Sequence, residues 1–380
     1  MPPLVDAGDF PGSKHAAYLD AANIGLMYQG AHRAILEWQS DVADNGSLAL
    51  PETVEGSALE GLHRSAASLL NAQPDDIAVG SSVTELLGSL AWAVAPGADS
   101  NVVGTAPSFP STINPWQRVA AHTGCEIRLA EGEGDIVRLD DVLELIDDDT
   151  AVVCISHVEY GRGQRFDLQS LATAAHDQGA LLVVDATQSA GAVPIDVQPD
   201  SLDVVLASGY KWLCGPFGAA VMYLAPHLQA KLEPGLVGFR SHEDMWDLQT
   251  DRLDYARSAR RFECSTMAYG CAIGLSRSIE FLLEVGVDRI YEHNEQLADL
   301  LIEGLRDRDL EITSPLADAE RSAIVTARKP GVDSAHTADR LRAARVVASS
   351  RGDSIRFSPH LYTVEEDVDR TLACLDEVLV

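Results

Sequence analysis

Lysine is scarce in this chain, and acidic residues are in large excess. Among 380 residues there are four lysines, at positions 14, 211, 231 and 329, beside 24 arginines and 58 acidic residues, and the formal net charge is −30. Such a surface repels polyanions, so nucleic acid and anionic membranes are not expected as partners. An acidic surface with little lysine suits a protein that works in high salt, where screening removes self-repulsion. An acidic protein from an ordinary environment fits nearly as well.

Long apolar runs and paired cysteines are also missing. No run approaches the roughly 18 residues of a membrane helix, and the start MPPLVDAGDFPG lacks the basic and apolar segments of a secretory signal. We therefore expect a cytoplasmic protein. The six cysteines form no C-x-x-C pair and have no histidine at metal-ligand spacing, so we expect free, mostly buried thiols and no metal site.

The length and composition bound the domain organisation. A chain of 380 residues with 46% hydrophobic residues can bury more than one ordinary core, yet no low-complexity or Gly/Ser-rich linker separates independent modules. We expect a large α/β domain over residues 20–260. A smaller α+β domain would combine residues 1–19 and 261–380.

Short apolar runs alternate with helical patterns between about residues 75 and 225. Their hydrophobicity is continuous, which is typical of strands buried on both faces of a mostly parallel sheet. One intervening segment predicts a helix that Asp167 caps and Gly179 ends. The pattern therefore predicts a three-layer α/β domain. The predicted strands are 76–80, 101–105, 151–156, 180–185, 203–208 and 219–224.

The pattern changes after residue 270. Residues 271–286 and 287–305 predict helices, and short strands are expected near 323–328 and 354–358. Thr363 and Glu366 have the spacing of a capping box that opens a last helix.

Polar residues follow two of the apolar runs, where an open α/β sheet places its ligand crevice. Lys211 comes just after a strand, between aromatic residues and before a Gly-Pro turn. Partial desolvation there would lower the pKa of its amine and make it nucleophilic toward an aldehyde. Asp185 ends the run LLVVD and needs a cationic or hydrogen-bonding partner at that buried edge, which a protonated pyridine nitrogen would supply. Taken singly, Lys211 could be a solvated lysine and Asp185 a turn cap.

The order of these motifs resembles a known family. Asp185 and Gln188 form D-x-x-Q, Ser208, Tyr210 and Lys211 form S-x-[HY]-K, and G-P-x-G follows. This arrangement resembles the class V aminotransferase family of pyridoxal-phosphate enzymes, which includes cysteine desulfurases, kynureninase and isopenicillin-N epimerase. The resemblance runs from about residue 18 to 376, and it implies a fold-type I enzyme with pyridoxal 5′-phosphate as cofactor.

The resemblance also implies coenzyme-binding residues. Lys211 would carry the coenzyme as a Schiff base and Asp185 would hold its ring nitrogen, which makes these two the expected catalytic residues. The stretch 80-GSSVTELL turns a strand into a helix whose first N–H groups suit a phosphate. The other implied coenzyme contacts are Val83, Thr84, Phe109 on the ring face, Tyr160 where desulfurases have asparagine, Gln188, Ser208 and Tyr210.

Two further regions are implied by the resemblance. The segment 260-RRFECSTMAY is similar to a family loop that completes the phosphate site of the neighbouring subunit, so Ser265 and Thr266 imply a homodimer with shared active sites. Serine replaces the family's glycine there. Arg356 matches the arginine that binds the substrate α-carboxylate, which suits the planar guanidinium, and Asn23 would line the same end of the pocket.

The sequence departs from the desulfurases in one decisive place. Their catalytic cysteine lies on a loop before the carboxylate-binding arginine, and here 345-RVVASSRGDSIRF contains none. Cys214 and Cys264 lie near the inferred site in the sequence, and we interpret both as structural thiols. The sequence therefore favours an enzyme that acts on a small amino acid by β-elimination, as a C–S lyase does. Transamination and epimerisation are the alternatives.

Two functions of other classes fit the sequence less well. A nicotinamide dehydrogenase would need G-x-G-x-x-G after its first strand, whereas 161-GRGQRF has two glycines and follows a later strand. A non-catalytic scaffold or sensor that holds the coenzyme would be expected to have lost Lys211, Asp185 or Arg356, and all three are present.

Overall fold

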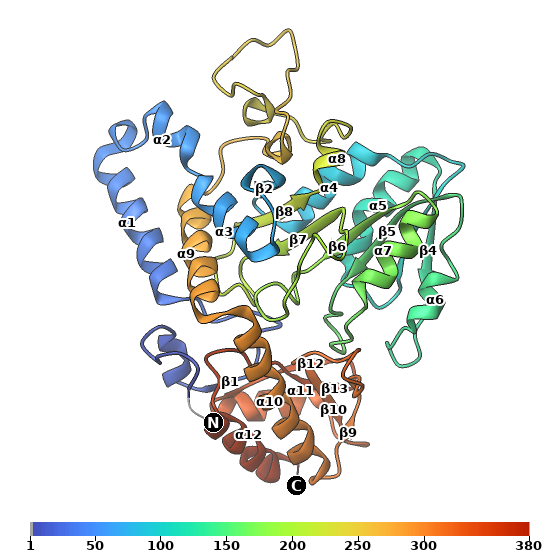
Figure 1. The fold of residues 1–380 in the computed structure, drawn as a ribbon. Coiled ribbons are helices and arrows are strands. Elements are labelled where there is room, and N and C mark those ends of the chain that lie inside the picture. Colours follow the sequence, from blue (N-terminus) through green and yellow to red (C-terminus); the bar gives the residue numbers. More distant parts are fainter. Residues whose placement is uncertain (1–2, 380) are drawn as a thin grey trace.

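A seven-stranded sheet forms the centre of the computed structural model, which describes residues 3–379 (Figure 1). β8 runs antiparallel to its neighbours β2 and β7, and the remaining neighbouring pairs are parallel. In spatial order the strands are β2 (Ile77–Gly80), β8 (Ala220–Leu224), β7 (Val204–Ser208), β6 (Leu181–Asp185), β5 (Thr150–Ser156), β3 (Asn101–Thr105) and β4 (Glu126–Ala130).

The apolar strands lie where the sequence predicts them. β3, β7 and β8 are buried along their whole length, as their continuous hydrophobicity requires. The sequence did not predict β4, because this edge strand carries Glu126 and Arg128 on an only partly covered surface. The mostly parallel three-layer α/β fold is thus confirmed, with helices on both faces of the sheet (Figure 1).

Helices connect and cover the strands. α7 begins after Asp167, whose side chain accepts a hydrogen bond from Gln169 N, and Gly179 follows the helix with a positive φ of 76°. The helices are α1 (Gln29–Asn45), α2 (Glu52–Ser57), α3 (Glu60–Leu70), α4 (Val83–Val94), α5 (Pro110–Thr123), α6 (Leu139–Leu143), α7 (Leu168–Asp177), α8 (Pro226–Gln229), α9 (Tyr269–Val285), α10 (Val287–Arg306), α11 (Ser334–Ala343) and α12 (Glu365–Val378).

A second, smaller sheet lies below the central one in Figure 1 and has its own helices. Its order is β12-β13-β10-β9, with antiparallel neighbours, and the N-terminal strand β1 pairs with β11 beside it. The strands are β1 (Ala17–Tyr18), β9 (Glu311–Ile312), β10 (Val325–Arg328), β11 (Val346–Val347), β12 (Ser349–Arg351) and β13 (Ser354–Phe357).

The start of α12 corrects one detail. The capping residues are Val364 and Asp367, because the Asp367 carboxylate accepts a hydrogen bond from Val364 N at 3.1 Å. The predicted pair, Thr363 and Glu366, lies one residue too early. The Thr363 hydroxyl instead bonds to the backbone of Tyr18 and His360. The pattern therefore located the helix but not its cap.

Two apolar cores correspond to the two sheets. The larger includes α9 and Ile290 of α10, together with Phe10, Leu361 and Tyr362. The smaller joins Ala17 and Leu19 to residues 297–375. α10 thus contributes to both cores. The predicted division of the chain into residues 20–260 and the remainder stays a prediction, and we propose from these cores that the C-terminal boundary lies within α10. No helix of the described residues is long and apolar enough to span a membrane.

Candidate active site

A pocket opens at the carboxyl ends of the central strands, where sheets of this type bind ligands. β5, β6 and β7 end there in Ser156, Asp185 and Ser208, and the loops that follow supply the rest of the wall. The structure brings nine predicted site residues together in this pocket: Val83, Thr84, Phe109, Tyr160, Asp185, Gln188, Ser208, Tyr210 and Lys211.

Lys211 lies in the turn after β7 and is buried, with 8% of its surface exposed. Burial lowers the pKa of its amine from 10.5 to about 8, and the positive charges of Arg356 and Arg351 act in the same direction, while Asp185 opposes them. The Nζ atom lies 5.6 Å from the ring centre of Phe109 and 5.8 Å from that of Tyr210. The structure therefore holds an amine that is easily deprotonated against two aromatic rings.

Asp185 ends β6 and points into the same pocket. Its carboxylate accepts hydrogen bonds from Thr112 Oγ1 at 3.2 Å and from Thr187 N at 2.9 Å. Neither donor carries a charge, so the buried carboxylate is left free to pair with a cationic group in the pocket.

The start of α4 forms another wall. Its N-cap Ser82 accepts a hydrogen bond from Glu85 N, and Val83 and Thr84 of the first turn line the pocket. First-turn N–H groups have no acceptor within their own helix, and the helix dipole is positive at this end. This corner can therefore bind a phosphate.

Gln188 and the N-terminal segment meet behind Lys211. The Gln188 amide donates to Ala22 O at 2.9 Å, and its oxygen accepts a hydrogen bond from Trp212 Nε1 at 2.8 Å. Gly25 N donates to Tyr210 O, and a Cβ at Gly25 would lie 2.0 Å from Lys211 O. Glycine is therefore required at position 25 for this close approach.

Arg356 lies on β13 of the small sheet, beside the pocket wall. Its Nη1 donates to Tyr160 O at 2.6 Å, and its Nη2 lies 3.7 Å from Asp20 Oδ1. Within the described residues Nε and Nη2 have no hydrogen-bond partner, although the side chain is fully buried. Burial lowers the pKa of this guanidinium to about 10. In the part of the chain that the structure describes, Nε has no partner and Nη2 has only the 3.7 Å ion pair with Asp20, so this edge of the guanidinium matches the two oxygens of a carboxylate.

Besides Arg356, three predicted residues lie outside this pocket wall. Asn23 is exposed, and its amide donates to Asp20 Oδ2 at 3.2 Å. Ser265 and Thr266 are also exposed. They were assigned to the pocket of a neighbouring subunit, so their distance from Lys211 in one chain leaves that prediction untested.

Nearly the whole chain matches one family of known enzymes. The family model described as "Aminotransferase class-V" matches residues 18–371. The chain belongs to the class V aminotransferase family. As a class V enzyme it depends on pyridoxal 5′-phosphate, which confirms the cofactor expected from the sequence.

Individual class V relatives are distant but match along nearly the whole length. An uncharacterized aminotransferase of Bacillus subtilis, YcbU, is 26% identical and aligns over 94% of this chain and 93% of its own. A probable cysteine desulfurase of Halobacterium salinarum is 28% identical over 97% and 94%. The solved cystine C–S lyase C-DES, in complex with cysteine persulfide, has a TM-score of 0.87 at 22% identity, with 96% and 98% of the chains covered. The last comparison shows the shared fold.

The pocket residues fit the coenzyme of a class V enzyme. Lys211 offers an amine for its aldehyde, Asp185 a carboxylate for its ring nitrogen, and the first turn of α4 a phosphate site. Phe109 packs edge-on against Tyr160, with ring centres 5.3 Å apart, and forms the aromatic wall. These individual roles stay predictions.

The thiols of this class V enzyme lie outside the pocket wall. Cys214 is fully buried with its Sγ directed at Trp212 O, and Cys264 is partly buried beside Glu85. Burial raises the pKa of both thiols, which disfavours the nucleophilic thiolate.

Sequence reasoning missed several residues of the site. Ser111, Ser156 and Thr187 line the pocket, and two of them could have been found as the polar residues that end or follow predicted strands. Glu159 lies in the same loop as Tyr160 but does not line the pocket. Its buried Oε1 accepts hydrogen bonds from Thr105 Oγ1 at 2.6 Å and Ser108 Oγ at 2.7 Å.

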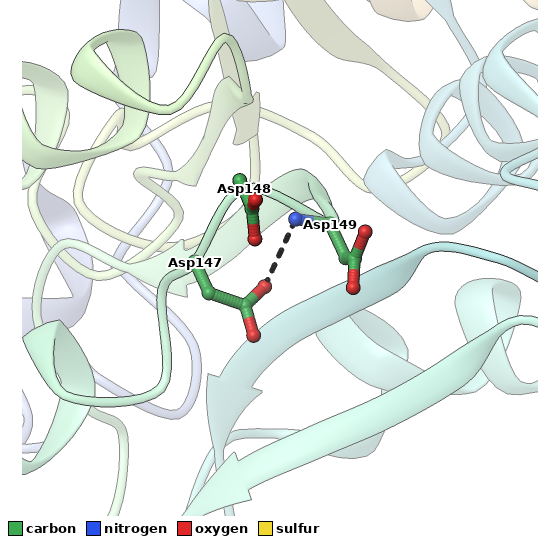
Figure 2. A group of neighbouring side chains, drawn as sticks. All are labelled: Asp147, Asp148 and Asp149. Atoms are coloured by element: carbon green, nitrogen blue, oxygen red, sulfur yellow. Dashed lines mark hydrogen bonds between the residues drawn. The ribbon is translucent and has the colours of Figure 1, made fainter.

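An acidic cluster elsewhere in the enzyme has a structural explanation. The carboxylate oxygens of Asp147, Asp148 and Asp149 lie within 4.8 Å of one another in the turn before β5 (Figure 2). The Asp147 carboxylate is already bonded to Arg128, to Asn101 Nδ2 and to Asp149 N. The bonds from Arg128 and Asn101 lower the pKa of Asp147 to about 2, and all three bonds hold the turn.

Proposed function

We propose that the enzyme removes the β-substituent of a small amino acid by elimination, as a C–S lyase does. The observation that carries this proposal is the segment before Arg356. It contains no cysteine, and β12 and β13 join there in a tight hairpin in which Arg351 pairs with Ser354. A chain without a thiol on this segment has no group there to take sulfur from a substrate.

The pocket residues would divide the work between them. When bound, pyridoxal phosphate supplies an aldehyde that accepts the substrate amine and a ring that withdraws electrons from Cα. Arg356 binds the α-carboxylate through Nε and Nη2, which have no hydrogen-bond partner among the described residues. Lys211, whose lowered pKa leaves much of the amine neutral near pH 8, takes the proton from Cα. Asp185 provides the negative charge that keeps the ring nitrogen protonated.

The known reaction of one structural neighbour supports this choice. C-DES, a cystine C–S lyase, shares the fold of the chain over almost its full length. Other relatives are described as probable cysteine desulfurases, so transfer of sulfur to the protein is the first alternative reaction to test. YcbU is described as an aminotransferase, so transamination is the second alternative.

One incubation separates these reactions. The holoenzyme is mixed with cysteine, cystine and cysteine S-conjugates in deuterated water, and pyruvate, alanine and Cα deuterium are followed together. Elimination predicts pyruvate and ammonia without alanine. Alanine together with a protein persulfide would refute the argument from the missing cysteine.

The remaining outcomes identify the alternatives. Deuterium exchange without pyruvate would indicate epimerisation, and turnover that requires a keto acid would indicate transamination. If no amino acid changes the absorbance of the bound coenzyme, the chain is a scaffold or sensor and not an enzyme of this type.

We also infer that the enzyme is a cytoplasmic homodimer with shared sites. Ser265 and Thr266 are exposed hydroxyls on a loop that begins beside α4, because Cys264 Sγ lies 3.8 Å from Glu85 Oε1. Sedimentation of the holoenzyme should therefore report a dimer, and Thr266→Ala should weaken coenzyme binding. A monomer that keeps its coenzyme would contradict the shared site.

A further inference from the structure

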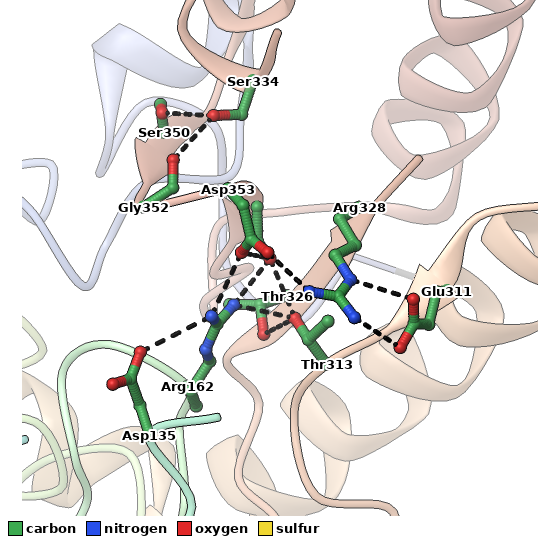
Figure 3. A network of polar contacts seen from close by, with 11 residues as sticks. Asp135, Arg162, Glu311, Thr313, Thr326, Arg328, Ser334, Ser350, Gly352 and Asp353 are labelled. Carbon is green, nitrogen blue, oxygen red and sulfur yellow. Dashed lines mark hydrogen bonds and ion pairs between the residues drawn. The ribbon is translucent and has the colours of Figure 1, made fainter. Parts of the chain in front are cut away.

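Arg162 connects the loop after β5 to the small sheet. Only 8% of its surface is exposed. Its Nη1 donates to Ser354 Oγ at 2.6 Å and Thr313 Oγ1 at 3.0 Å, and its Nη2 donates to Asp353 Oδ1 at 3.1 Å (Figure 3). Asp135 Oδ2, in the loop between β4 and α6, lies 3.5 Å from the same Nη2. One buried guanidinium therefore joins two parts of the fold.

The contacts of Arg162 lie next to those of Arg356. Residues two apart on a strand share a face, so Ser354 and Arg356 point to the same side of β13. Ser354 is bonded by Arg162, and Arg356 is bonded by the carbonyl of Tyr160, two residues earlier on the same loop. The loop thus holds β13 at two successive positions of one face, and Tyr160 also lines the pocket.

Residues 163–165 of this loop pack against the segment that leads into β10. A Cβ at Gly163, which has a φ of 72°, would lie 2.6 Å from Ile324 Cβ, and Ser322 Oγ donates to Gly163 O at 2.7 Å. Arg165 N donates to Glu320 O at 2.7 Å. With the backbone fixed on either side, the Arg162 side chain is held where it meets the turn at Asp353.

We propose that Arg162 is a positioning residue for the substrate carboxylate. By fixing the Asp353–Ser354 turn it sets the place of Arg356 beside the pocket, so that preference for ligands with an α-carboxylate depends on it. The inference rests on the proposed role of Arg356. It does not depend on which bond of the substrate is broken.

A second arginine in the same network provides a matched control. Arg328 Nη1 donates to the other oxygen of Asp353 at 2.6 Å, and its Nε and Nη2 bond to Glu311 at 2.9 and 3.0 Å (Figure 3). Its side chain is 40% exposed, whereas that of Arg162 is 9% exposed. Exposed ion pairs contribute little, whereas removing the buried Arg162 side chain deprives the Ser354 and Thr313 hydroxyls of its hydrogen bonds. Arg328→Ala should therefore leave the turn in place.

The test compares two ligands of the holoenzyme by the change each causes in coenzyme absorbance. L-Alanine carries the α-carboxylate, and ethylamine is the same molecule without it. Arg162→Ala should raise the dissociation constant of L-alanine about tenfold or more, because a small displacement of the carboxylate-binding group is costly. The dissociation constant of ethylamine should stay within about twofold of the wild-type value. Arg328→Ala should leave both dissociation constants unchanged. Arg162→Lys should be intermediate, since an ammonium cannot bond to the serine and the aspartate in the same fork.

A milder variant guards against misfolding. Ser354→Ala removes the 2.6 Å bond from Arg162, together with the Ser354 contacts to Asp353 and Thr313, but keeps the ion pairs, so it should lower the preference for L-alanine in a protein that still folds. The proposal would be overturned if Arg162→Ala lost the same affinity for both ligands, or if the ratio of the two dissociation constants were unchanged in both variants. A wild-type enzyme that does not prefer L-alanine to ethylamine would also overturn it. L-Alanine has no β-substituent to lose, so absence of pyruvate in the elimination assay would refute the proposed reaction without affecting this result.

Discussion

Glu159 is a buried acid in the loop after β5, and its protonation should control the stability of the folded chain. It is 1% exposed, and Thr105 and Ser108 both donate to its Oε1, while Oε2 has no hydrogen-bond partner among the described residues. Burial raises the pKa of the Glu159 carboxyl from 4.5 to about 7, and the charge of Asp185 adds to the effect, while the hydroxyls of Thr105, Ser108 and Ser156 oppose it. At neutral pH a large fraction of this carboxyl is therefore protonated.

The pKa shift sets the sign and size of a stability change. Below pH 4.5 the carboxyl is protonated in both the folded and the unfolded chain, and between pH 4.5 and about 7 only the folded chain keeps the proton. The free energy of unfolding therefore falls as pH rises through this window, by about 1.4 kcal/mol for each pH unit. The total loss is about 3 kcal/mol, and it is complete above the folded-state pKa.

Glu159→Gln removes the titration and keeps an acceptor for Thr105 and Ser108. Its free energy of unfolding relative to wild type should therefore rise by about 3 kcal/mol between about pH 4.5 and 7.5. Urea unfolding at several pH values measures this difference, and groups that titrate alike in both proteins cancel. Glu131→Gln, which removes an exposed carboxyl, is the matched control. Parallel pH profiles for Glu159→Gln and wild type would refute the reasoning, as would the same gap in the control.

Three further predictions concern the coenzyme and the surface. Because burial lowers the pKa of Lys211 to about 8, attachment of added pyridoxal phosphate to the apoenzyme should accelerate as pH rises through that value, and borohydride reduction with peptide mapping should find the pyridoxyl group on Lys211 and not on Lys231. Asp185→Ala should still bind the coenzyme through the phosphate site but exchange the substrate Cα proton about a hundredfold more slowly, so a wild-type exchange rate would exclude it as the partner of the ring nitrogen. If the net charge of −30 reflects a high-salt environment, the unfolding temperature should rise steadily between about 0.1 and 2 M KCl, whereas a flat profile would favour an ordinary acidic protein.

The spacing of a few residues was enough to identify the family and its fold. Asp185, Ser208 and Lys211 follow apolar runs whose length and continuity indicate buried strands, and strands of that kind meet at one sheet edge. The missed strand β4 and the shifted cap of α12 mark the limits of such reasoning. An exposed edge strand carries mixed polarity, and neighbouring residues of similar type compete for one capping position.

What the sequence by itself determined, then, is the order of most of the elements and the coenzyme, because these depend on local hydrophobic periodicity and on short motifs. Only the tertiary structure decided which distant groups come into contact. Arg162 and Ser354 are 192 residues apart, and Thr105 and Glu159 are 54 apart. No local pattern specifies these contacts, because they arise where a loop of the large sheet packs against the small sheet and where two strand ends lie side by side.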